Sequence, residues 1–466
     1  MMSILTQYLL QKGWITNMKI RLMLGIIVCK LLLFIGKISG KKASSAPGMY
    51  ATKICPDLLS LLARQVKEKK ICVLGTNGKT TTNNMINMLL ENSGYKTVCN
   101  KIGANMIDGA TTAFADKADI FGRLDCDYSV IEVDEAYAKI LFKFFSPDII
   151  VITNLFRDQL DRYGEIDMTV DHIKKAIESA PNAALVLNMD DPISNHFSKI
   201  CANKVVSYGV FEKVLSDTEE TQEGKYCRLC GSELRYNYYH YSQLGDYECK
   251  SCGYKREKPD FFATNVNNMG KVSFTLNEKT KINSNTYGFY NIYNMLAAIS
   301  VLEASDVKID DYTKAFSFYK PQVARMEEFD FKKPIILNLA KNPAGFNQAI
   351  SAVVNDNRKK AVVIAVNDAP SDGRDITWIY DVDFEKLKDF SAYAVSGKRR
   401  YDLALRLYYG DICENPEIGE DTASLAIKLL DSDCEVVYAL VNYTVMFDTQ
   451  IKLLSELKKY KETKSE

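Results

Sequence analysis

The chain has 466 residues, which is enough for two or three domains with hydrophobic cores of their own. Apolar residues make up 47% and charged residues 25%, as in ordinary globular proteins. Lys and Arg number 59 and so do Asp and Glu, so no overall charge directs the chain towards nucleic acid, and we expect no nucleic-acid partner.

The first predicted element, within residues 1–49, is a strongly apolar segment running from Ile20 to Ile38. About 19 residues is just long enough to span a bilayer, but Lys30 falls in the middle, where a cation costs on the order of 3 kcal/mol. No small-residue cleavage site of a signal peptide follows closely. We favour an amphipathic helix that packs on the domain or, as the alternative, lies on the membrane surface.

A nucleotide site is predicted next. Residues 69–74 (KKICVL) read as a buried strand, and GTNGKTTTNNMINMLLENSG continues as a glycine loop and then a helix. Lys79 is expected to neutralise the β- and γ-phosphates, and Thr80 to offer a hydroxyl to Mg²⁺. Val73 stands where the general motif has its first glycine, so the loop is a variant. The predicted ATP-binding residues here are Gly75, Thr76, Asn77, Gly78, Lys79, Thr80 and Thr81.

Twelve cysteines divide into eight single ones, which we expect in cores, and two Cys-x₂-Cys pairs. The pairs, with 18 residues between the inner cysteines, fit a four-thiolate zinc site that has no open position and is therefore structural. A nucleic-acid-binding ribbon and disulfides are the weaker alternatives. Free thiols together with a metal site indicate a reducing cytoplasm. The predicted zinc ligands are Cys227, Cys230, Cys249 and Cys252.

Towards the C-terminus, strand-like runs (AVVIAVND, YAVSG, EVVYALVNY) alternate with stretches that read as helical (DFEKLKDF, DTASLAIKLL). We therefore expect an α/β protein with three parts: an N-terminal helix in 1–49, a central ATP-binding domain with a parallel sheet in 50–324, and a doubly wound α/β domain in 325–466. The zinc ribbon is an insertion at 222–258. The active site should lie between the two larger domains, so that their closure gates the chemistry.

The loop GTNGKTT resembles that of the Mur ligases and folylpolyglutamate synthetases, and further motifs follow in family order. In YSVIEVDE the resemblance makes Glu132 a magnesium ligand, with Asp134 and Glu135 as its neighbours. In YNIYNMLAAISVL it makes Asn294 a reader of adenine, and in ARMEEF it makes Arg325 a phosphate contact. ATP and Mg²⁺ are thus implied.

Other positions depart from the family pattern. In TNLFRDQLDRYG, Asn154, Asp158 and Asp161 match, but Gln159 replaces a histidine that helps hold a second metal. Lys174 stands at the distance of a carbamylated lysine, although the plain reading is a surface lysine. The family's ribose-binding aspartate and a nearby histidine are replaced by Asn338 and Lys341.

Within the family, the zinc ribbon and the DGRD-x-x-WIYD-x-DFE stretch resemble the MurT group, the ligase subunits of lipid II isoglutaminyl synthase. This implies ATP-dependent amidation of the α-carboxylate of D-glutamate in lipid II, through an acyl phosphate. Ammonia would come from a partner glutaminase, GatD, and the protein would work in the cytoplasm or at the inner face of the membrane. Lys79 and Glu132 are the expected catalytic residues of the ligase, and Asp375 is expected to contribute to the glutaminase site.

Two alternatives stay open. An amino-acid-adding ligase of the Mur or folylpolyglutamate type would use an amine in place of ammonia; it would be supported by a uridine-nucleotide domain ahead of the phosphate loop, for which the segment before Gly75 leaves little room. A non-catalytic nucleotide switch would need only the loop and the ribbon. The acids within 132–135 and 158–161 favour metal-assisted transfer over such a switch.

Overall fold

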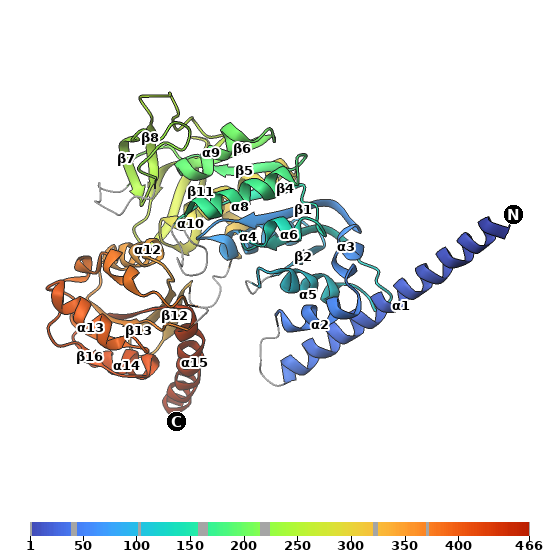
Figure 1. Ribbon diagram of the computed structural model, residues 1–466. Coiled ribbons are helices and arrows are strands. Elements are labelled where there is room, and N and C mark those ends of the chain that lie inside the picture. Colours follow the sequence, from blue (N-terminus) through green and yellow to red (C-terminus); the bar gives the residue numbers. More distant parts are fainter. Residues whose placement is uncertain are drawn as a thin grey trace.

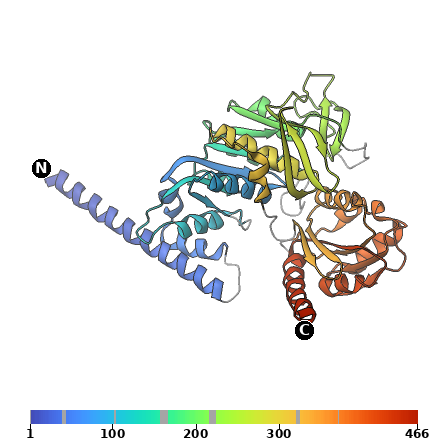
Figure 2. The same cartoon turned by 180° about the vertical axis from the view of Figure 1, so that it is seen from behind.

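The computed structural model describes residues 2–38, 44–100, 104–156, 166–214, 224–319, 325–369 and 372–465. Two α/β domains lie side by side, with a small ribbon at one end of the first and a long N-terminal helix along its opposite side (Figures 1 and 2). The expected α/β class, the parallel sheets and the four-cysteine cluster are all confirmed.

The central domain is built on a nine-stranded sheet in the order β11-β10-β9-β6-β5-β4-β1-β3-β2. In this order the strands from β9 through to β2 run parallel to one another. At the other edge, β10 pairs antiparallel with both β9 and β11. The bounds of these strands are β1 Val66–Leu74, β2 Thr97–Cys99, β3 Cys126–Glu132, β4 Ile149–Ile152, β5 Ala184–Asn188, β6 Val205–Val210, β9 Phe261–Asn267, β10 Lys271–Leu276 and β11 Thr280–Tyr287.

Helices cover both faces of this sheet, because successive residues of a strand point to opposite faces. In β1, Cys72 and Leu74 face a core with α5, α8 and α9, whereas Ile71 and Val73 face a core with α4 and α10. The helices are α2 Ala46–Ile54, α3 Leu58–Ala63, α4 Lys79–Asn92, α5 Ile107–Lys117, α6 Ala138–Leu141, α8 Ile166–Glu178, α9 Pro192–Ile200, α10 Tyr290–Ala304 and α11 Tyr312–Ser317.

The order of the strands determines where a ligand can bind. β1 lies between β3 and β4, because the chain first builds strands on one side of β1 and then on the other. Such a reversal leaves a crevice at the carboxyl ends of the strands. The glycine loop, Glu132 and Thr153 all follow the carboxyl ends of these three strands.

The second domain holds a six-stranded sheet in the order β12-β13-β17-β14-β15-β16, parallel except for β12. Helices α14 and α15 pack on one face and α12 and α13 on the other, so the doubly wound expectation is confirmed. The elements are β12 Arg325–Asp330, β13 Pro334–Leu339, α12 Pro343–Val354, β14 Lys360–Ala365, η1 Thr377–Asp381, η2 Phe384–Leu387, β15 Ala392–Ser396, α13 Arg400–Tyr409, β16 Glu417–Ile418, α14 Thr422–Leu429, β17 Val436–Val441 and α15 Tyr443–Ser465.

One expected helix of this domain is shorter than predicted. DFEKLKDF forms only the 3₁₀ turn η2, in which Phe384 and Leu387 are buried. Their spacing of three residues suits both kinds of helix, so the pattern alone favoured the commoner α-helix. Asp389, with φ of 67°, turns the chain out of any helix directly afterwards.

The N-terminal segment forms α1 (Met2–Ile38), which crosses α2 and α5. Ile26 and Cys29 are fully buried against them, Arg21 donates to the carbonyl of Ile54 (2.9 Å), and Lys30 donates to that of Asp116 (2.5 Å). Packing on the domain, the favoured alternative, is thus what the structure shows. Among the described residues, no helix is long and apolar enough to cross a bilayer.

Candidate active site

The phosphate loop takes the conformation that its glycines predict. Gly75 and Gly78 have φ values of 121° and 83°, in the region that favours glycine. A Cβ atom on Gly78 would lie 2.3 Å from the side-chain oxygen of Asn294, and one on Gly75 would lie 2.2 Å from the hydroxyl of Thr153. The loop leads directly into α4, whose N-terminal end carries the partial positive charge that favours an anion.

Neighbouring strand ends hold this loop in place. Asn77 donates its N–H to the carboxamide oxygen of Asn154 (2.9 Å), and the carboxamide nitrogen of Asn154 donates to the carbonyl of Asn77 (3.0 Å). The hydroxyl of Thr76 donates to the carbonyl of Phe156 and accepts from its N–H, both at 3.0 Å. The segment after β4, expected at a metal site, thus also braces the phosphate loop.

Lys79 is buried and paired. Its ammonium group lies 2.9 Å from the carboxylate of Glu135, which also accepts the N–H of Gly75 at 2.8 Å. The sequence made Glu135 only a neighbour of the magnesium ligand. The structure shows that Glu135 pairs with Lys79 of the loop, a contact that no local pattern signals.

Glu132 meets the requirements of a magnesium ligand. It is buried at the end of β3, and its Oε2 has no hydrogen-bond partner among the described residues. The hydroxyl of Thr80 bonds to the same carboxyl group. Burial raises the pKa of Glu132, although the charges of Lys79, Arg325 and Lys341 oppose the rise. A buried carboxylate oxygen beside a hydroxyl fits Mg²⁺, which prefers oxygen ligands.

Asn294 lies against the loop. Its amide donates to Asn291 (2.9 Å), and its oxygen accepts from the hydroxyl of Thr82 in α4 (3.2 Å). The expected contact of Asn294 with adenine, and that of Arg325 with phosphate, stay predictions. Arg325 begins β12 of the second domain, close enough to influence the pKa of Glu132.

The second domain touches the phosphate loop directly. The carboxamides of Asn77 and Asn342 exchange two hydrogen bonds, at 3.3 and 3.2 Å. Asn342 also caps α12 by accepting the N–H of Gly345 at 2.8 Å. This pair of amides, which we call the interdomain clasp, lies in the stretch that resembles a family motif, but the sequence did not single out Asn342.

A cavity of about 320 Å³ lies where the two domains meet, beside the C-terminal end of α12, whereas Asn342 of the clasp caps the N-terminal end of that helix. Two of its lining residues adjoin elements with predicted ATP contacts: Gly288 lies shortly before α10, which holds Asn294, and Met326 follows Arg325. Its lining comes from both domains: Asn268, Met269, Gly270, Tyr287 and Gly288 from the first, and Met326, Glu328, Ile336, Ala352, Asn355, Asp356, Asn357, Arg358 and Tyr438 from the second.

The four cysteines converge as predicted. Their sulfur atoms all lie within 4.8 Å of one another, with Cys227 3.5 Å from Cys252 and Cys230 3.5 Å from Cys249. The backbone N–H and the hydroxyl of Ser232 lower the pKa of Cys230 to about 6, which favours the thiolate. Four sulfurs at this separation fit a tetrahedral zinc ion.

The hairpin between the cysteine pairs, β7 (Arg235–Tyr241) and β8 (Leu244–Glu248), reaches the active site through its turn. There the buried amide of Gln243 donates to the carbonyl of Leu155 (2.7 Å) and to the carboxylate of Asp191 (3.3 Å). Asp191 also accepts the N–H of Leu155 at 2.9 Å. Gln243 of the ribbon is bonded to Leu155, and the next residue, Phe156, is bonded to Thr76 of the phosphate loop. The ribbon is linked to the phosphate loop in this way.

A second buried network joins the ribbon to α10. His240 of β7 lies 2.6 Å from the hydroxyl of Tyr293, which donates to Asp190 at 2.8 Å, and Arg256 pairs with Asp190 at 2.6 Å. Burial alone would raise the pKa of Asp190, but Arg256 and His240 hold it below its usual value. Tyr293 precedes Asn294, so this network fixes the helix that lies on the loop.

Asp375 has a different setting. It is half-buried, and its carboxylate accepts the N–H (2.8 Å) and the hydroxyl (2.7 Å) of Thr377 at the start of η1. Asp372 is buried and accepts the N–H of Thr444 at 2.9 Å, and Asp368 pairs with Arg399 at 2.7 Å. Asp375 thus has a turn-capping role, while the acids around it hold the loop to the domain.

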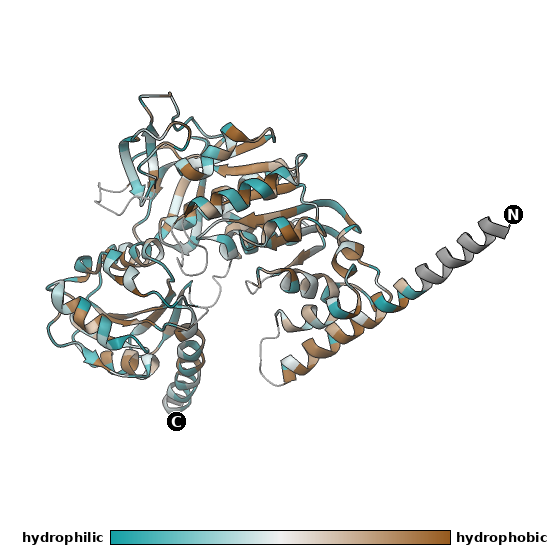
Figure 3. Cartoon of the chain, viewed as in Figure 1, coloured by the Kyte–Doolittle hydropathy of each residue, from teal (hydrophilic) through white to brown (hydrophobic). Residues whose placement is uncertain are grey.

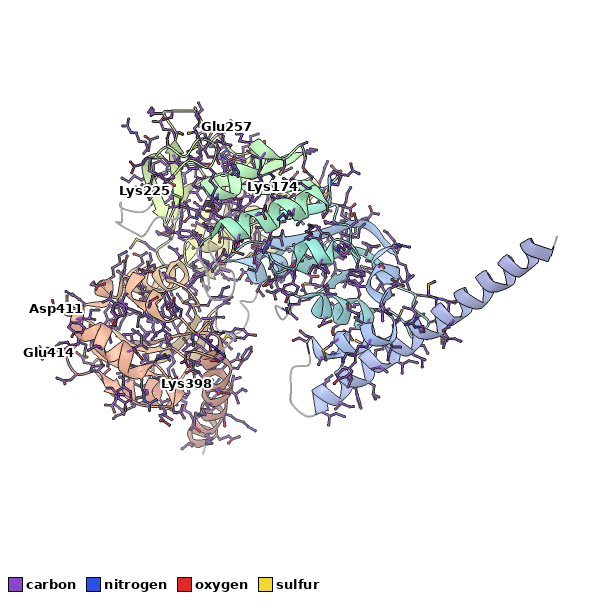
Figure 4. The ribbon with its side chains drawn as sticks, viewed as in Figure 1. Lys174, Lys225, Glu257, Lys398, Asp411 and Glu414 are labelled. Carbon is purple, nitrogen blue, oxygen red and sulfur yellow. The ribbon has the colours of Figure 1, made fainter. Side chains whose placement is uncertain are left out.

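Two predictions remain, one for Lys174 and one for the segment that contains Asp158, Gln159 and Asp161. Lys174 lies on α8, where its charge acts on His196 and Cys201 of the α9 region (Figure 4). Burial, followed by the charges of Arg228 and Lys174, lowers the pKa of His196 to about 4. The cations that act most strongly on the pKa of Glu132 are Lys79, Arg325 and Lys341, and Lys174 is not among them. Asp158, Gln159 and Asp161 lie outside the described residues.

Comparisons with known proteins agree with this geometry. Residues 73–302 match the model of the Mur ligase middle domain, and residues 339–446 match that of the MurT ligase C-terminal domain. The chain is 37% identical over 424 residues to the lipid II isoglutaminyl synthase (glutamine-hydrolyzing) subunit MurT of Staphylococcus aureus, covering 90% of this chain and 94% of the relative. It is 30% identical over 452 residues to the subunit of the same name from Streptococcus pneumoniae, covering 94% and 98%.

Solved structures support the fold alone, since their sequences are more distant. A pseudomurein peptide ligase type C from Methanothermus fervidus superposes with a TM-score of 0.65 at 22% identity, covering 84% of this chain and 79% of that one. MurF from Acinetobacter baumannii superposes with a TM-score of 0.63 at 16% identity, covering 88% and 80%.

Proposed function

The chain belongs to the MurT family and is an ATP-dependent ligase of the Mur type, and we propose that it converts the α-carboxylate of D-glutamate in the stem peptide of lipid II to an amide. The observation that carries the proposal is the braced phosphate loop facing a buried, half-satisfied Glu132, in a chain that matches its relatives over nearly their whole length.

The first step forms an acyl phosphate. A carboxylate oxygen of the glutamate attacks the γ-phosphorus of ATP, the bond to the bridging oxygen breaks, and ADP leaves. Lys79 and the N–H groups of the loop stabilise the charge on the transferred group. Thr80 and Glu132 would hold Mg²⁺, which supplies further neutralisation of phosphate charge. Support for these roles comes from the burial of Lys79 and from the unpartnered oxygen of Glu132.

The second step forms the amide. Ammonia attacks the acyl carbon, the carbon–oxygen bond breaks, phosphate leaves and the nitrogen loses a proton, giving D-isoglutamine. The word "subunit" in the names of the relatives supports a partner complex. We assign the ammonia supply to a glutaminase, GatD, with Asp375 orienting an imidazole of that partner. The position of Asp375 at a half-buried turn is compatible with this role.

The nucleoside end of ATP is assigned to the cavity between the domains. Support comes from two of its lining residues: Gly288 lies shortly before α10, which places Asn294 against the loop, and Met326 follows Arg325, whose charge acts on Glu132. An ATP molecule bound there would contact both domains, so that binding favours their closure. The zinc ion, held by the four cysteines, is assigned a structural role because all four ligand positions are protein sulfurs.

The test is amidation of lipid II by the purified chain with ATP and ammonium, in the presence of hydroxylamine in a parallel reaction. We expect isoglutaminyl lipid II in the first reaction and a hydroxamate, trapped from the acyl phosphate, in the second. An amino-acid-adding ligase would leave lipid II unamidated and consume ATP only when an amino acid is supplied. A nucleotide switch would give neither product, and either result would reject the proposal.

A further inference from the structure

Helix α1 is apolar on two opposite faces, and only one of them is covered. Gly25, Ile26 and Cys29 pack against α2, α3 and α5. On the other side runs a row of exposed side chains, which we call the apolar stripe. Its spacing of three and four residues places it along one face of the helix. It consists of Ile20, Leu24, Ile27, Leu31, Phe34, Ile35 and Ile38, which are between 42% and 71% exposed.

In Figure 3 the coloured part of α1 is mostly brown, so hydrophobic residues follow one another along the stretch of the helix that lies beside α2 and α5. Seven large apolar side chains in one row form a continuous surface, unlike the single exposed apolar residues scattered over any protein surface. Contiguous exposed apolar surfaces mark sites of contact with a protein or a membrane, and no part of the described chain covers this one.

The charged residues of α1 indicate what covers the apolar stripe. Lys19, Lys30 and Lys37 are 11 and 7 residues apart, so they line one flank of the stripe, and Arg21 lies on the other flank. The helix contains no acidic residue. A second copy of α1 laid on the stripe would therefore bring cations against cations. Lys30 and Arg21 are bonded to carbonyls of the domain, so the exposed Lys19 and Lys37 are the cations that anionic lipid headgroups complement, and their stems can extend from the apolar boundary to the headgroups.

The contacts that hold α1 on the central domain also fix the direction in which the apolar stripe faces. Lys30 and Arg21 are fixed by backbone carbonyls of Asp116 and Ile54, so the stripe is presented in one orientation. The helix lies on the side of the central domain opposite to the zinc ribbon (Figure 1). An interfacial helix buries its apolar face at the boundary of headgroups and acyl chains while lying parallel to the membrane.

We propose that the apolar stripe of α1 and its flanking cations dock the protein onto an anionic membrane surface, with α1 lying in the plane of the membrane. The exposed apolar stripe itself is observed in the structure. That the surface brings the ligase to a lipid-linked substrate rests on the proposed function, whereas membrane binding does not.

The experiment is co-sedimentation of the full chain with vesicles of phosphatidylglycerol and phosphatidylcholine, compared with phosphatidylcholine alone, without ATP. We expect binding to the anionic vesicles that weakens as salt is raised. The double variant Leu31→Glu/Phe34→Glu should reduce binding at least about tenfold, because it places two charges on the apolar stripe. The control is Ile451→Glu, which adds a charge at a 64% exposed position of α15 and should bind like the parent.

Three outcomes would overturn the proposal. The parent could fail to bind either vesicle, or the double variant could bind as well as the parent. The third is a concentration-dependent dimer of the parent that the double variant abolishes, since this would make a second copy the occupant of the stripe. Circular dichroism checks that the double variant is folded. Vesicle binding without amidation would reject only the proposed function, and amidation without vesicle binding would reject only this inference.

Discussion

The phosphate loop and the Asp375 loop are the two regions to which the chain's chemistry is assigned, and they are built differently. Around the phosphate loop, Lys79 is paired with Glu135, Asn77 with Asn154 and Thr76 with Phe156, all from strand ends of the same domain. Asp375 bonds to Thr377, two residues along the chain, and stays half-exposed. One site is assembled from distant segments, and the other is a locally ordered turn.

This difference indicates what each region can do alone. A site that must stabilise moving phosphate charge needs fixed donors that are shielded from water, which the central domain provides. A carboxylate that orients an imidazole needs only to be presented at the correct place, once the imidazole is supplied. We therefore expect ligase chemistry from this chain alone and glutaminase chemistry only from a complex.

The largest effect is expected at Lys79. Lys79→Ala should lower kcat for ammonium-driven amidation about 10²–10³-fold, because it removes a fixed cation from the transferred phosphoryl group. Steady-state kinetics measure this. Lys398→Ala, at an exposed lysine of the second domain, is the control. A Lys79→Ala enzyme within about twofold of the parent would show that the loop is not the reacting site.

The zinc ribbon allows a second test of the difference between the two loops, because its contacts among the described residues brace the phosphate loop and not the Asp375 loop. Gln243→Ala leaves the carbonyl of Leu155 and an oxygen of Asp191 without this donor, which should cost about 1–3 kcal/mol of stability and raise KM for ATP. Urea unfolding and ATP titration measure the two effects. Asn237→Ala removes an exposed hydrogen bond of the same ribbon, and equal losses in both variants would contradict the linkage.

The contribution of Asp191 to the stability of this region should also depend on pH. Burial raises the pKa of Asp191 to about 6 from its ordinary 3.8. A raised pKa of an acid means that its contribution to stability is fully present below about 3.8 and is lost as pH rises through about 6. Unfolding across this window should therefore show a slope that Asp191→Asn changes by at most about 1.4 kcal/mol per pH unit. Superimposable pH profiles would contradict the assignment.

The smallest effect is expected at the interdomain clasp. Asn342→Ser retains a cap for α12 but is too short to reach Asn77, so it should lose about 1 kcal/mol of interaction, or about fivefold in ATP affinity. Isothermal titration measures the affinity. Asn415→Ser, at an exposed position of the same domain outside the cavity lining, serves as the matched change. Unaltered ATP affinity in Asn342→Ser would mean that the clasp does not assist closure.

The sequence predicts the features that depend on local pattern. Strand, glycine loop and helix follow one another within about thirty residues, and the structure confirms this order at β1 and α4. The spacing of the cysteines was sufficient to predict that their sulfurs converge. The alternating pattern of the second domain likewise predicted its sheet.

Contacts between distant segments were not predictable in this way. Asn77 and Asn342 are 265 positions apart, and Gln243 lies 88 positions from Leu155. Glu135 could be recognised as an acid near the loop, but its pairing with Lys79 depends on how the chain turns after β3. Such side-chain contacts follow from tertiary placement, which neither periodicity nor composition specifies.

The most direct test of the division between the two regions is Asp375→Asn, measured with two nitrogen sources. In the presence of the glutaminase GatD, glutamine-driven amidation of lipid II should fall sharply while ammonium-driven amidation stays at the parent rate. Asp389→Asn, an exposed position in the same domain, should change neither. Equal loss with both nitrogen sources, in a folded Asp375→Asn protein, would place Asp375 in the ligase site and contradict the account.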